Sequence, residues 1–185
     1  SGHQIGAVLH LAGVLRDKPL SRMSADDFNA VFGPKVKGLR SLWSALQSSQ
    51  DVKWMLFSSV SSLLGSASQA NYCAANGFLD AFAATQSHVV SLNWGPWGGA
   101  GMWTTVDERV KDALGFNDLQ PAAAASMLDF AYRSGVAQLG IFRLRGRVVP
   151  QGRFLARDIV VKQPATAKKT QPQLISADNV DAHSE

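Results

Sequence analysis

The sequence contains a single cysteine, Cys73, in 185 residues, which excludes an internal disulfide and a zinc site built from several thiolates. Its four histidines are scattered without metal-ligand spacing, so no metal site is expected. No uninterrupted apolar run approaches the roughly 18 residues of a membrane-spanning helix, and the N-terminus lacks the layout of a signal peptide. These absences predict no membrane span and a reducing location, the cytoplasm or an organelle stroma.

Positive charge is also scarce over most of the chain, although 18 basic and 14 acidic residues give a formal net charge of +4. Residues 1–142 hold ten of each sign, whereas residues 143–185 hold eight basic and four acidic ones. This basic end lacks the interleaved aromatic side chains of a nucleic-acid-binding segment, so no nucleic-acid partner is expected. The remaining composition, 46% hydrophobic and 17% charged, is that of an ordinary globular protein.

Strand-like and helix-like patterns alternate along the chain. Residues 5–14 form a nearly continuous apolar run, which predicts a central strand buried on both faces. Ser24–Asp27 has the form of a capping box, and an amphipathic helix is expected from there to Leu46, interrupted at Gly33-Pro34. Further on, the patterns predict a strand over 54–60, a loop over 61–68, a helix over 69–86 and a strand over 89–94. This rhythm predicts an α/β fold with a doubly wound parallel sheet.

The last third of the chain is less regular. Residues 95–101 are rich in glycine and predict a mobile loop. Helices are expected over 102–114 and 121–133, and a last strand over 138–144. Residues 162–185 are polar and rich in Lys, Gln, Ala and Pro, which is typical of a linker.

Three polar residues are candidates for a functional site at one end of this sheet. Ser59 ends a predicted strand, where open α/β sheets bind ligands. Tyr72 follows thirteen residues later near the start of a helix, and Asn76 shares its helix face at i+4. Because a phenol has a reference pKa near 10, an acid–base role for Tyr72 needs a neighbouring cation or donor that stabilises the phenolate.

The order Ser59, Tyr72, Asn76, preceded by His10-Leu-Ala-Gly13 and Lys35-Val-Lys-Gly38, resembles the ketoreductase domain of modular type I polyketide synthases. That domain belongs to the short-chain dehydrogenase/reductase superfamily. Commoner members carry a lysine four residues after the tyrosine, whereas synthase ketoreductases have Asn there and the lysine on the preceding helix. Lys35, 24 residues before Ser59, fits this exchange better than Lys37 does. The match continues through Ser91–Trp97 and covers roughly residues 5–150.

The resemblance implies NADPH-dependent reduction of a carrier-bound β-ketoacyl thioester to the β-hydroxyacyl thioester. Tyr72 would donate a proton to the ketone oxygen, and Ser59 would hydrogen-bond that oxygen. Lys35 would stabilise the phenolate and contact the nicotinamide ribose, while Asn76 would support proton relay. The implied partners are an acyl carrier protein, whose phosphopantetheine holds the substrate, and other synthase domains.

Other motifs carry expectations about cofactor and stereochemistry. Ala12 and Gly13 would lie at the adenine-side ribose, where small residues permit close approach. Beside the nicotinamide, the resemblance places Gly95, Pro96 and Trp97. In this family a Leu-x-Asp tripeptide marks enzymes that give a D-configured 3-hydroxyl, and a Trp eight residues before the tyrosine marks the opposite class. This sequence has Asp17 in Leu15-Arg16-Asp17 and Leu64 at the tryptophan position, so the D product is expected.

The resemblance also predicts a domain organisation. Residues 1–150 correspond to the C-terminal catalytic part of a Rossmann-like ketoreductase domain whose N-terminal βαβ cofactor half is missing. Residues 151–185 correspond to a linker toward an acyl carrier domain. Two alternatives stay open: a non-catalytic structural or docking remnant, and the equivalent domain of a type I fatty acid synthase.

Overall fold

The computed structural model describes residues 5–46, 52–99 and 115–144. The expected alternation of strands and helices is present there, in the order β1 Ala7–His10, η1 Leu20–Arg22, α1 Ala25–Phe32, η2 Gly33–Lys37, α2 Gly38–Leu46, β2 Lys53–Ser59, α3 Val60–Leu64, α4 Ala70–Ala84, β3 Val89–Trp94, β4 Phe116–Asn117, α6 Pro121–Ser134, β5 Gln138–Ile141 and β6 Arg143–Leu144. The expected helix over 102–114 and the linker over 162–185 lie outside the described residues.

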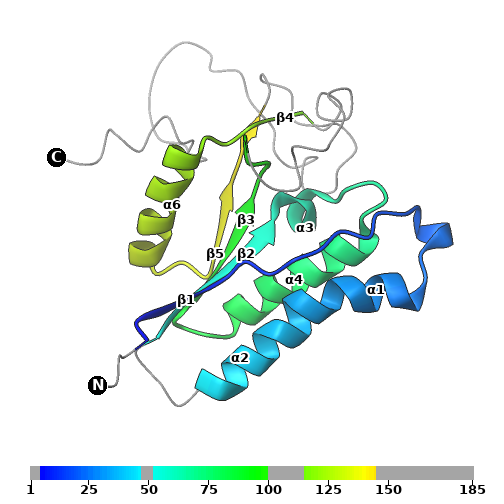
Figure 1. The fold of residues 1–185 in the computed structure, drawn as a ribbon. Coiled ribbons are helices and arrows are strands. Elements are labelled where there is room, and N and C mark those ends of the chain that lie inside the picture. Colours follow the sequence, from blue (N-terminus) through cyan, green and yellow to red (C-terminus); the bar gives the residue numbers. More distant parts are fainter. Residues whose placement is uncertain (1–4, 47–51, 100–114, 145–185) are drawn as a thin grey trace, which may run out of the picture. The chain divides into compact units, whose positions relative to one another are not determined.

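The larger sheet has the strand order β1-β2-β3-β5, and β1, β2 and β3 run parallel (Figure 1). His10 pairs with Leu56, and Ser59 pairs with Trp94. The carboxyl ends of these strands therefore meet at one edge, which is where α/β sheets bind ligands. The predicted parallel α/β sheet is confirmed.

The first strand differs from its prediction. β1 is an edge strand, with β2 as its neighbour, and is shorter than the apolar run over 5–14. Leu9 on this strand is 46% exposed, and Ile5 just before it is 48% exposed. The expectation of a strand buried on both faces is therefore wrong for the described chain. An apolar run reports the chemistry of its side chains but not how many strands lie beside it.

The helical segment after β1 follows its sequence signals closely. Ser24 caps α1 through a complete capping box with Asp27. The interruption expected at Gly33-Pro34 is the π-helical turn η2 between α1 and α2. Proline lacks the amide hydrogen that an α-helical turn needs, which favours such an irregular turn. Within η2, Lys35 is buried and Lys37 is exposed.

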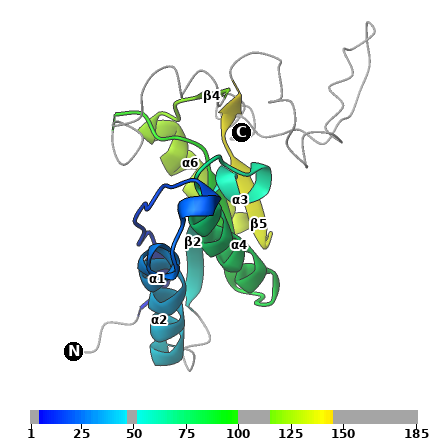
Figure 2. The same ribbon diagram turned by 90° about the vertical axis from the view of Figure 1, so that its right-hand side faces the viewer.

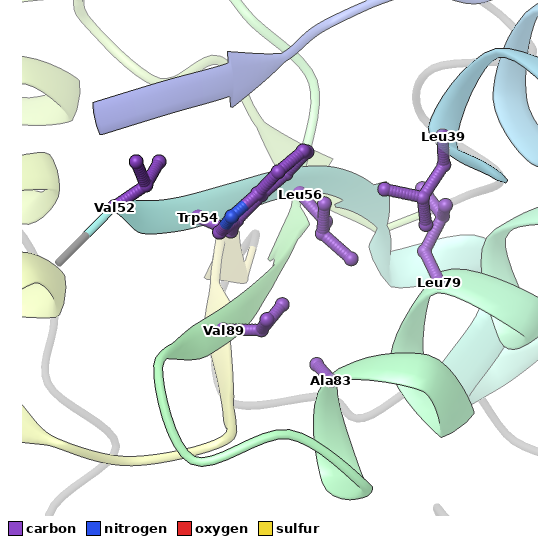
Figure 3. Close-up of a cluster of buried hydrophobic side chains, with 7 residues drawn as sticks. All are labelled: Leu39, Val52, Trp54, Leu56, Leu79, Ala83 and Val89. Carbon is purple, nitrogen blue, oxygen red and sulfur yellow. The ribbon is translucent and has the colours of Figure 1, made fainter. Parts of the chain in front are cut away.

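Helices α2 and α4 lie on one face of the sheet (Figures 1 and 2). An apolar core joins them to it. Its buried members form one cluster (Figure 3): Leu39, Val52, Trp54, Leu56, Leu79, Ala83 and Val89. Burial of one large apolar side chain stabilises a fold by about 1.5–3 kcal/mol. This cluster therefore fixes α4, the helix of Tyr72 and Asn76, against the strand that ends in Ser59.

Two further elements differ from the expectations. Val60, expected as the end of a strand, and residues 61–64, expected as loop, form the short helix α3 Val60–Leu64. Ser59 caps this helix by accepting a hydrogen bond from the Ser61 amide. The strand expected over 138–144 is divided into β5 and β6, and β6 pairs with the short strand β4 in an antiparallel sheet. Segments as short as these carry too little periodicity to reveal such elements.

The chain divides into two compact units, with breaks after Trp94, Leu128 and Gly140. The first unit contains β1, β2, β3 and the helices from η1 to α4, together with residues 129–140. Among the described residues, the second unit contains 95–99, 115–128 and 141–144, which include β4 and β6. Within the described ranges, no helix has the length and apolar character needed to cross a membrane.

Candidate active site

Lys35 is a buried cation at the carboxyl ends of the strands. It is 2% exposed, and its Nζ donates a hydrogen bond to the Phe57 carbonyl oxygen at 2.9 Å. Burial lowers its pKa from 10.5 to about 8, and the negative charge of Asp80 partly opposes this decrease. Lysine is almost never buried without a partner, so this placement indicates a site rather than a surface helix residue.

The surroundings of Lys35 hold both its backbone and its side chain. The Nε2 atom of buried His10 lies 2.9 Å from the Lys35 carbonyl oxygen. Burial is the main cause that lowers the pKa of His10, which favours a neutral imidazole. Beside the lysine stem lies Gly13, where an added Cβ would come within 3.2 Å of Lys35 Cε. His10 is thus a core residue that fixes η2, and Gly13 leaves room for the lysine.

Tyr72 projects from α4 toward this lysine. Lys35 Nζ lies 5.5 Å from the centre of the Tyr72 ring. Burial, the largest cause, raises the pKa of Tyr72, whereas hydrogen bonding from the Asn76 and Ser59 side chains lowers it. Asp17 and Cys73 add small upward contributions. The phenol is therefore held protonated at neutral pH, next to the cation and donors that would stabilise its ionised form.

Ser59 is oriented by its neighbours in α3. The Ser61 amide and hydroxyl both donate to Ser59 Oγ, at 3.2 Å and 2.9 Å. A serine hydroxyl has two lone pairs and one proton, so these two bonds use its acceptor capacity. The Ser59 proton is left to donate on the side of Tyr72, where a residue that binds the ketone oxygen would need it.

Asn76 is fully buried one turn after Tyr72. Its side-chain Nδ2 donates to the Tyr72 backbone carbonyl oxygen at 2.9 Å. The backbone carbonyl oxygen of Asn76 accepts from the Ser58 hydroxyl at 3.3 Å. Within the part of the chain that the structure describes, Asn76 Oδ1 is buried without a hydrogen-bond partner. An orphaned buried acceptor costs about 1–3 kcal/mol, and native proteins keep few of them outside functional sites.

The stereocontrol segment lies beside α4. Asp17 Oδ2 accepts a hydrogen bond from Gln69 Nε2 at 2.8 Å, three residues before Tyr72. The Lys18 amide donates to the Ser68 carbonyl oxygen at 2.9 Å. Leu64, at the expected tryptophan position, is 9% exposed within α3. The structure thus brings Asp17 near the tyrosine and places Leu64 in the packed interior.

The structure does not place the remaining predicted cofactor residues at this site. Gly95, Pro96 and Trp97 belong to the second compact unit, whereas Lys35 and Tyr72 belong to the first. An added Cβ at Gly95 would lie 2.7 Å from Phe142 Cβ, so packing alone explains the glycine there. Ala12 is exposed just before Gly13.

Sequence reasoning missed two kinds of residue here. One is Ser61, whose buried hydroxyl orients Ser59. The other is Asp80, whose carboxylate acts on Lys35. Asp80 had a usable signal, since the one charged residue of α4, one turn after Asn76, calls for an explanation. Ser61 had no such signal, because the segment of α3 that contains it was expected to be loop.

A parallel α/β sheet with a serine, a tyrosine and a buried lysine at the carboxyl ends of its strands defines a short-chain dehydrogenase/reductase. The family model described as KR domain matches residues 1–99, more than half of the sequence. The chain belongs to this ketoreductase (KR) domain family of polyketide synthases, a branch of the NAD(P)-dependent reductases.

Individual relatives agree with this assignment. The chain is 37% identical to the polyketide synthase GfsA of Streptomyces halstedii over 147 residues, which cover 76% of this chain and 2% of that protein. It is 36% identical to 6-methylsalicylic acid synthase of Penicillium terrestre over 129 residues, 65% of this chain and 7% of that protein.

A solved structure described as the first ketoreductase of the tylosin polyketide synthase has a TM-score of 0.68 and 32% identity. The likeness covers 75% of this chain and 32% of that one, so the chain spans about a third of the length of a solved ketoreductase. The Rossmann-like fold class is therefore confirmed.

Proposed function

We propose that this chain provides the catalytic residues of an NADPH-dependent ketoreductase, which reduces a carrier-bound β-ketoacyl thioester to the β-hydroxyacyl thioester. The observation that carries the proposal is that the side chains of Lys35, Tyr72 and Ser59 meet at one buried site. The Lys35 ammonium lies 5.5 Å from the Tyr72 ring, and the Ser59 hydroxyl acts on the same phenol. Family membership and this arrangement together support ketone reduction.

The surroundings of each proposed catalytic side chain suit it to one step of the ketone reduction. Tyr72, protonated at neutral pH, donates its proton to the ketone oxygen. Ser59, whose lone pairs are occupied by Ser61, donates a hydrogen bond to the same oxygen and fixes the carbonyl. The Lys35 ammonium stabilises the phenolate left behind, and Asn76 supports the return of a proton to it.

The residues present fit the reacting end of a nicotinamide cofactor, which supplies a hydride when bound. Lys35 has three ammonium protons and uses one on the Phe57 carbonyl oxygen, so others are available for ribose hydroxyls. Ala12 and Gly13 are proposed for the adenine-side ribose, where small residues permit close approach, and Gly95, Pro96 and Trp97 are proposed for the nicotinamide side. Because the chain covers 32% of a solved ketoreductase, we assign the pyrophosphate contacts to other parts of a longer polypeptide.

The proposal includes the D-configured product. Asp17 is fixed by Gln69 three residues before Tyr72, so this carboxylate is positioned to guide the entering substrate. Leu64 lacks the bulk of the tryptophan that marks the opposite class. Chiral analysis of the reduced thioester should give mainly the D alcohol, and a mainly L product would overturn this assignment.

The proposed setting is a synthase that carries several domains. Residues 1–150 are the catalytic part of the ketoreductase domain, and residues 151–185 are the linker toward an acyl carrier domain. The substrate then arrives on the phosphopantetheine of that carrier, in the cytoplasm or an organelle stroma. Both reported relatives are synthases far longer than this chain, which supports the setting and favours a polyketide over a fatty acid parent.

The test measures NADPH oxidation with a β-ketoacyl thioester by the synthase polypeptide that carries this sequence. Tyr72→Phe removes the proton donor and should lower kcat by about 10²-fold or more, with KM little changed. Tyr132→Phe, on exposed surface, is the matched control and should leave the rate unchanged. An inactive wild type would favour the non-catalytic remnant, and equal rates for Tyr72→Phe and wild type would remove Tyr72 from the mechanism.

A further inference from the structure

A cluster of polar side chains lies behind Ser59 and Asn76, and its centre is the Asp80 carboxylate. Ser62 Oγ and Ser91 Oγ each approach a different oxygen of Asp80 at 2.6 Å. Asn93 Nδ2 approaches both oxygens, at 3.0 Å and 2.9 Å. All of these donors are neutral, and within the described residues no Lys or Arg forms an ion pair with Asp80. The Asp80 carboxylate is therefore held by neutral donors alone in this part of the structure.

The Asp80 cluster reaches Ser59 through the backbone carbonyl group of that residue. Ser62 Oγ lies 2.8 Å from the Ser59 carbonyl oxygen, and Asn93 Nδ2 contacts the same oxygen at 3.4 Å. Ser62 has a single hydroxyl proton, and the charged, closer carboxylate is the stronger acceptor. Removal of the carboxylate would therefore redirect that proton to the Ser59 carbonyl oxygen and change the hydrogen bonding at the end of β2 that carries Ser59.

The charge of Asp80 also acts on Lys35. Burial is the main influence on the lysine and disfavours its ammonium form, and among the described residues Asp80 is the anion that favours it. The other titratable groups nearby do not take this role. His10 is a buried imidazole, Tyr72 is a protonated phenol, and Asp17 acts on the phenol rather than on the ammonium.

We propose that Asp80 is a positioning residue of the site: its carboxylate orders the donors behind Ser59 and supplies the negative charge that acts on Lys35. Asp80 contacts neither substrate nor cofactor in this proposal. Its consequence for catalysis rests on the proposed reductase function, whereas its effect on Lys35 can be measured in the chain alone.

The direct test is NMR titration of the 185-residue chain labelled at the lysine Cε, with the Lys35 signal assigned by its loss in Lys35→Met. Asp80→Asn should lower the pKa of Lys35 by on the order of half a unit to one unit. Ser91→Ala removes one hydrogen bond to Asp80 but keeps the charge, so it should lower stability and leave the Lys35 titration unchanged.

The outcomes separate charge from packing. An Asp80→Asn titration identical to wild type would overturn the proposal, and so would an equal shift in Ser91→Ala. If Asp80→Asn does not fold, Asp80→Ser carries the same measurement, since it removes the charge without turning new amide protons toward Ser62 and Ser91.

In the active synthase polypeptide, Asp80→Asn should lower kcat more than it changes KM and move the alkaline limb of the rate profile to lower pH. An unmoved limb together with an unmoved Lys35 pKa would assign Asp80 to packing alone. An inactive wild type would instead remove the proposed function while the NMR result still decides the proposal.

Discussion

The buried ammonium of Lys35 should make the folded chain less stable than it would be with an apolar residue there. The pKa of Lys35 falls from 10.5 to about 8 on folding, mainly through burial. A decrease of this size corresponds to about 3 kcal/mol of lost stability at neutral pH, since one pKa unit is worth about 1.4 kcal/mol. The hydrogen bond from Nζ to Phe57 offsets part of this cost.

Lys35→Met removes the charge and keeps most of the side-chain volume. It also leaves the Phe57 carbonyl oxygen without its donor, at a cost of about 1–2 kcal/mol. The net expectation is a variant about 1–2 kcal/mol more stable than wild type at about pH 7. In the synthase polypeptide the same variant should lose ketone reduction, because the phenolate of Tyr72 would lack its cation.

The pH dependence provides the sharper measurement. Between about pH 8 and pH 10.5 the unfolded chain still binds the lysine proton while the folded chain has lost it, so wild-type stability rises with pH. Lys35→Met lacks this rise, so its advantage should shrink by about 2 kcal/mol from about pH 7 to about pH 9.5. The comparison stops at about pH 9.5 because Tyr72, whose pKa is raised on folding, lowers the stability of the folded chain as the pH rises further.

Urea unfolding followed by tryptophan fluorescence measures both quantities, because Trp54 lies in the apolar core. Lys37→Met is the matched control, since Lys37 belongs to the same π-helical turn but is exposed. This control should change stability by less than about 0.5 kcal/mol at either pH. A difference between wild type and Lys35→Met that stays constant with pH would refute the assigned burial of the ammonium.

Three further predictions use other parts of the chain. Gly95→Ala should destabilise the second compact unit by about 1–3 kcal/mol in urea unfolding, because the new Cβ would lie 2.7 Å from Phe142 Cβ; unaltered stability would contradict that contact. Asp27→Asn should lower stability at neutral pH and flatten the acid limb of thermal unfolding. The folded pKa of Asp27 is depressed, chiefly by the hydrogen bond from the Lys18 ammonium and then by those from Ser24, so the contribution of Asp27 is lost as the pH falls through that value. In a Tyr132→Phe background, which leaves one of the two tyrosines, absorbance titration should place Tyr72 above the ordinary phenol pKa of 10, and a midpoint below 10 would show that burial is not dominant.

The sequence could predict those parts of the fold whose signals are local. Strand β3 and the capping box at Ser24 depend on a few adjacent residues, and both appear as expected. The exposed edge at β1 depends on which strands lie beside it, and the run over 5–14 contains no such information. Helix α3 was missed because five residues rich in serine and leucine do not show a helical period.

The candidate site divides in the same way. Spacing could order Ser59, Tyr72 and Asn76, and the resemblance to synthase ketoreductases could favour Lys35 over Lys37. The structure adds the reason, since the π-helical turn buries the first lysine and exposes the second. For Gly95, the family pattern indicated a cofactor contact, whereas the structure offers a packing reason for the glycine that the linear sequence could not reveal.

Burial of the site acts on its two titratable groups in opposite directions, and both effects suit a proton donor. The phenol of Tyr72 is pushed toward its protonated form, so it holds a proton to give at neutral pH. The pKa of Lys35 is lowered only to about 8, so the ammonium survives at neutral pH and can stabilise the phenolate as it forms. A more deeply buried lysine without the Asp80 charge would become neutral and lose this ability. The proposed chemistry therefore depends on a balance in which Asp80 limits what burial does to Lys35.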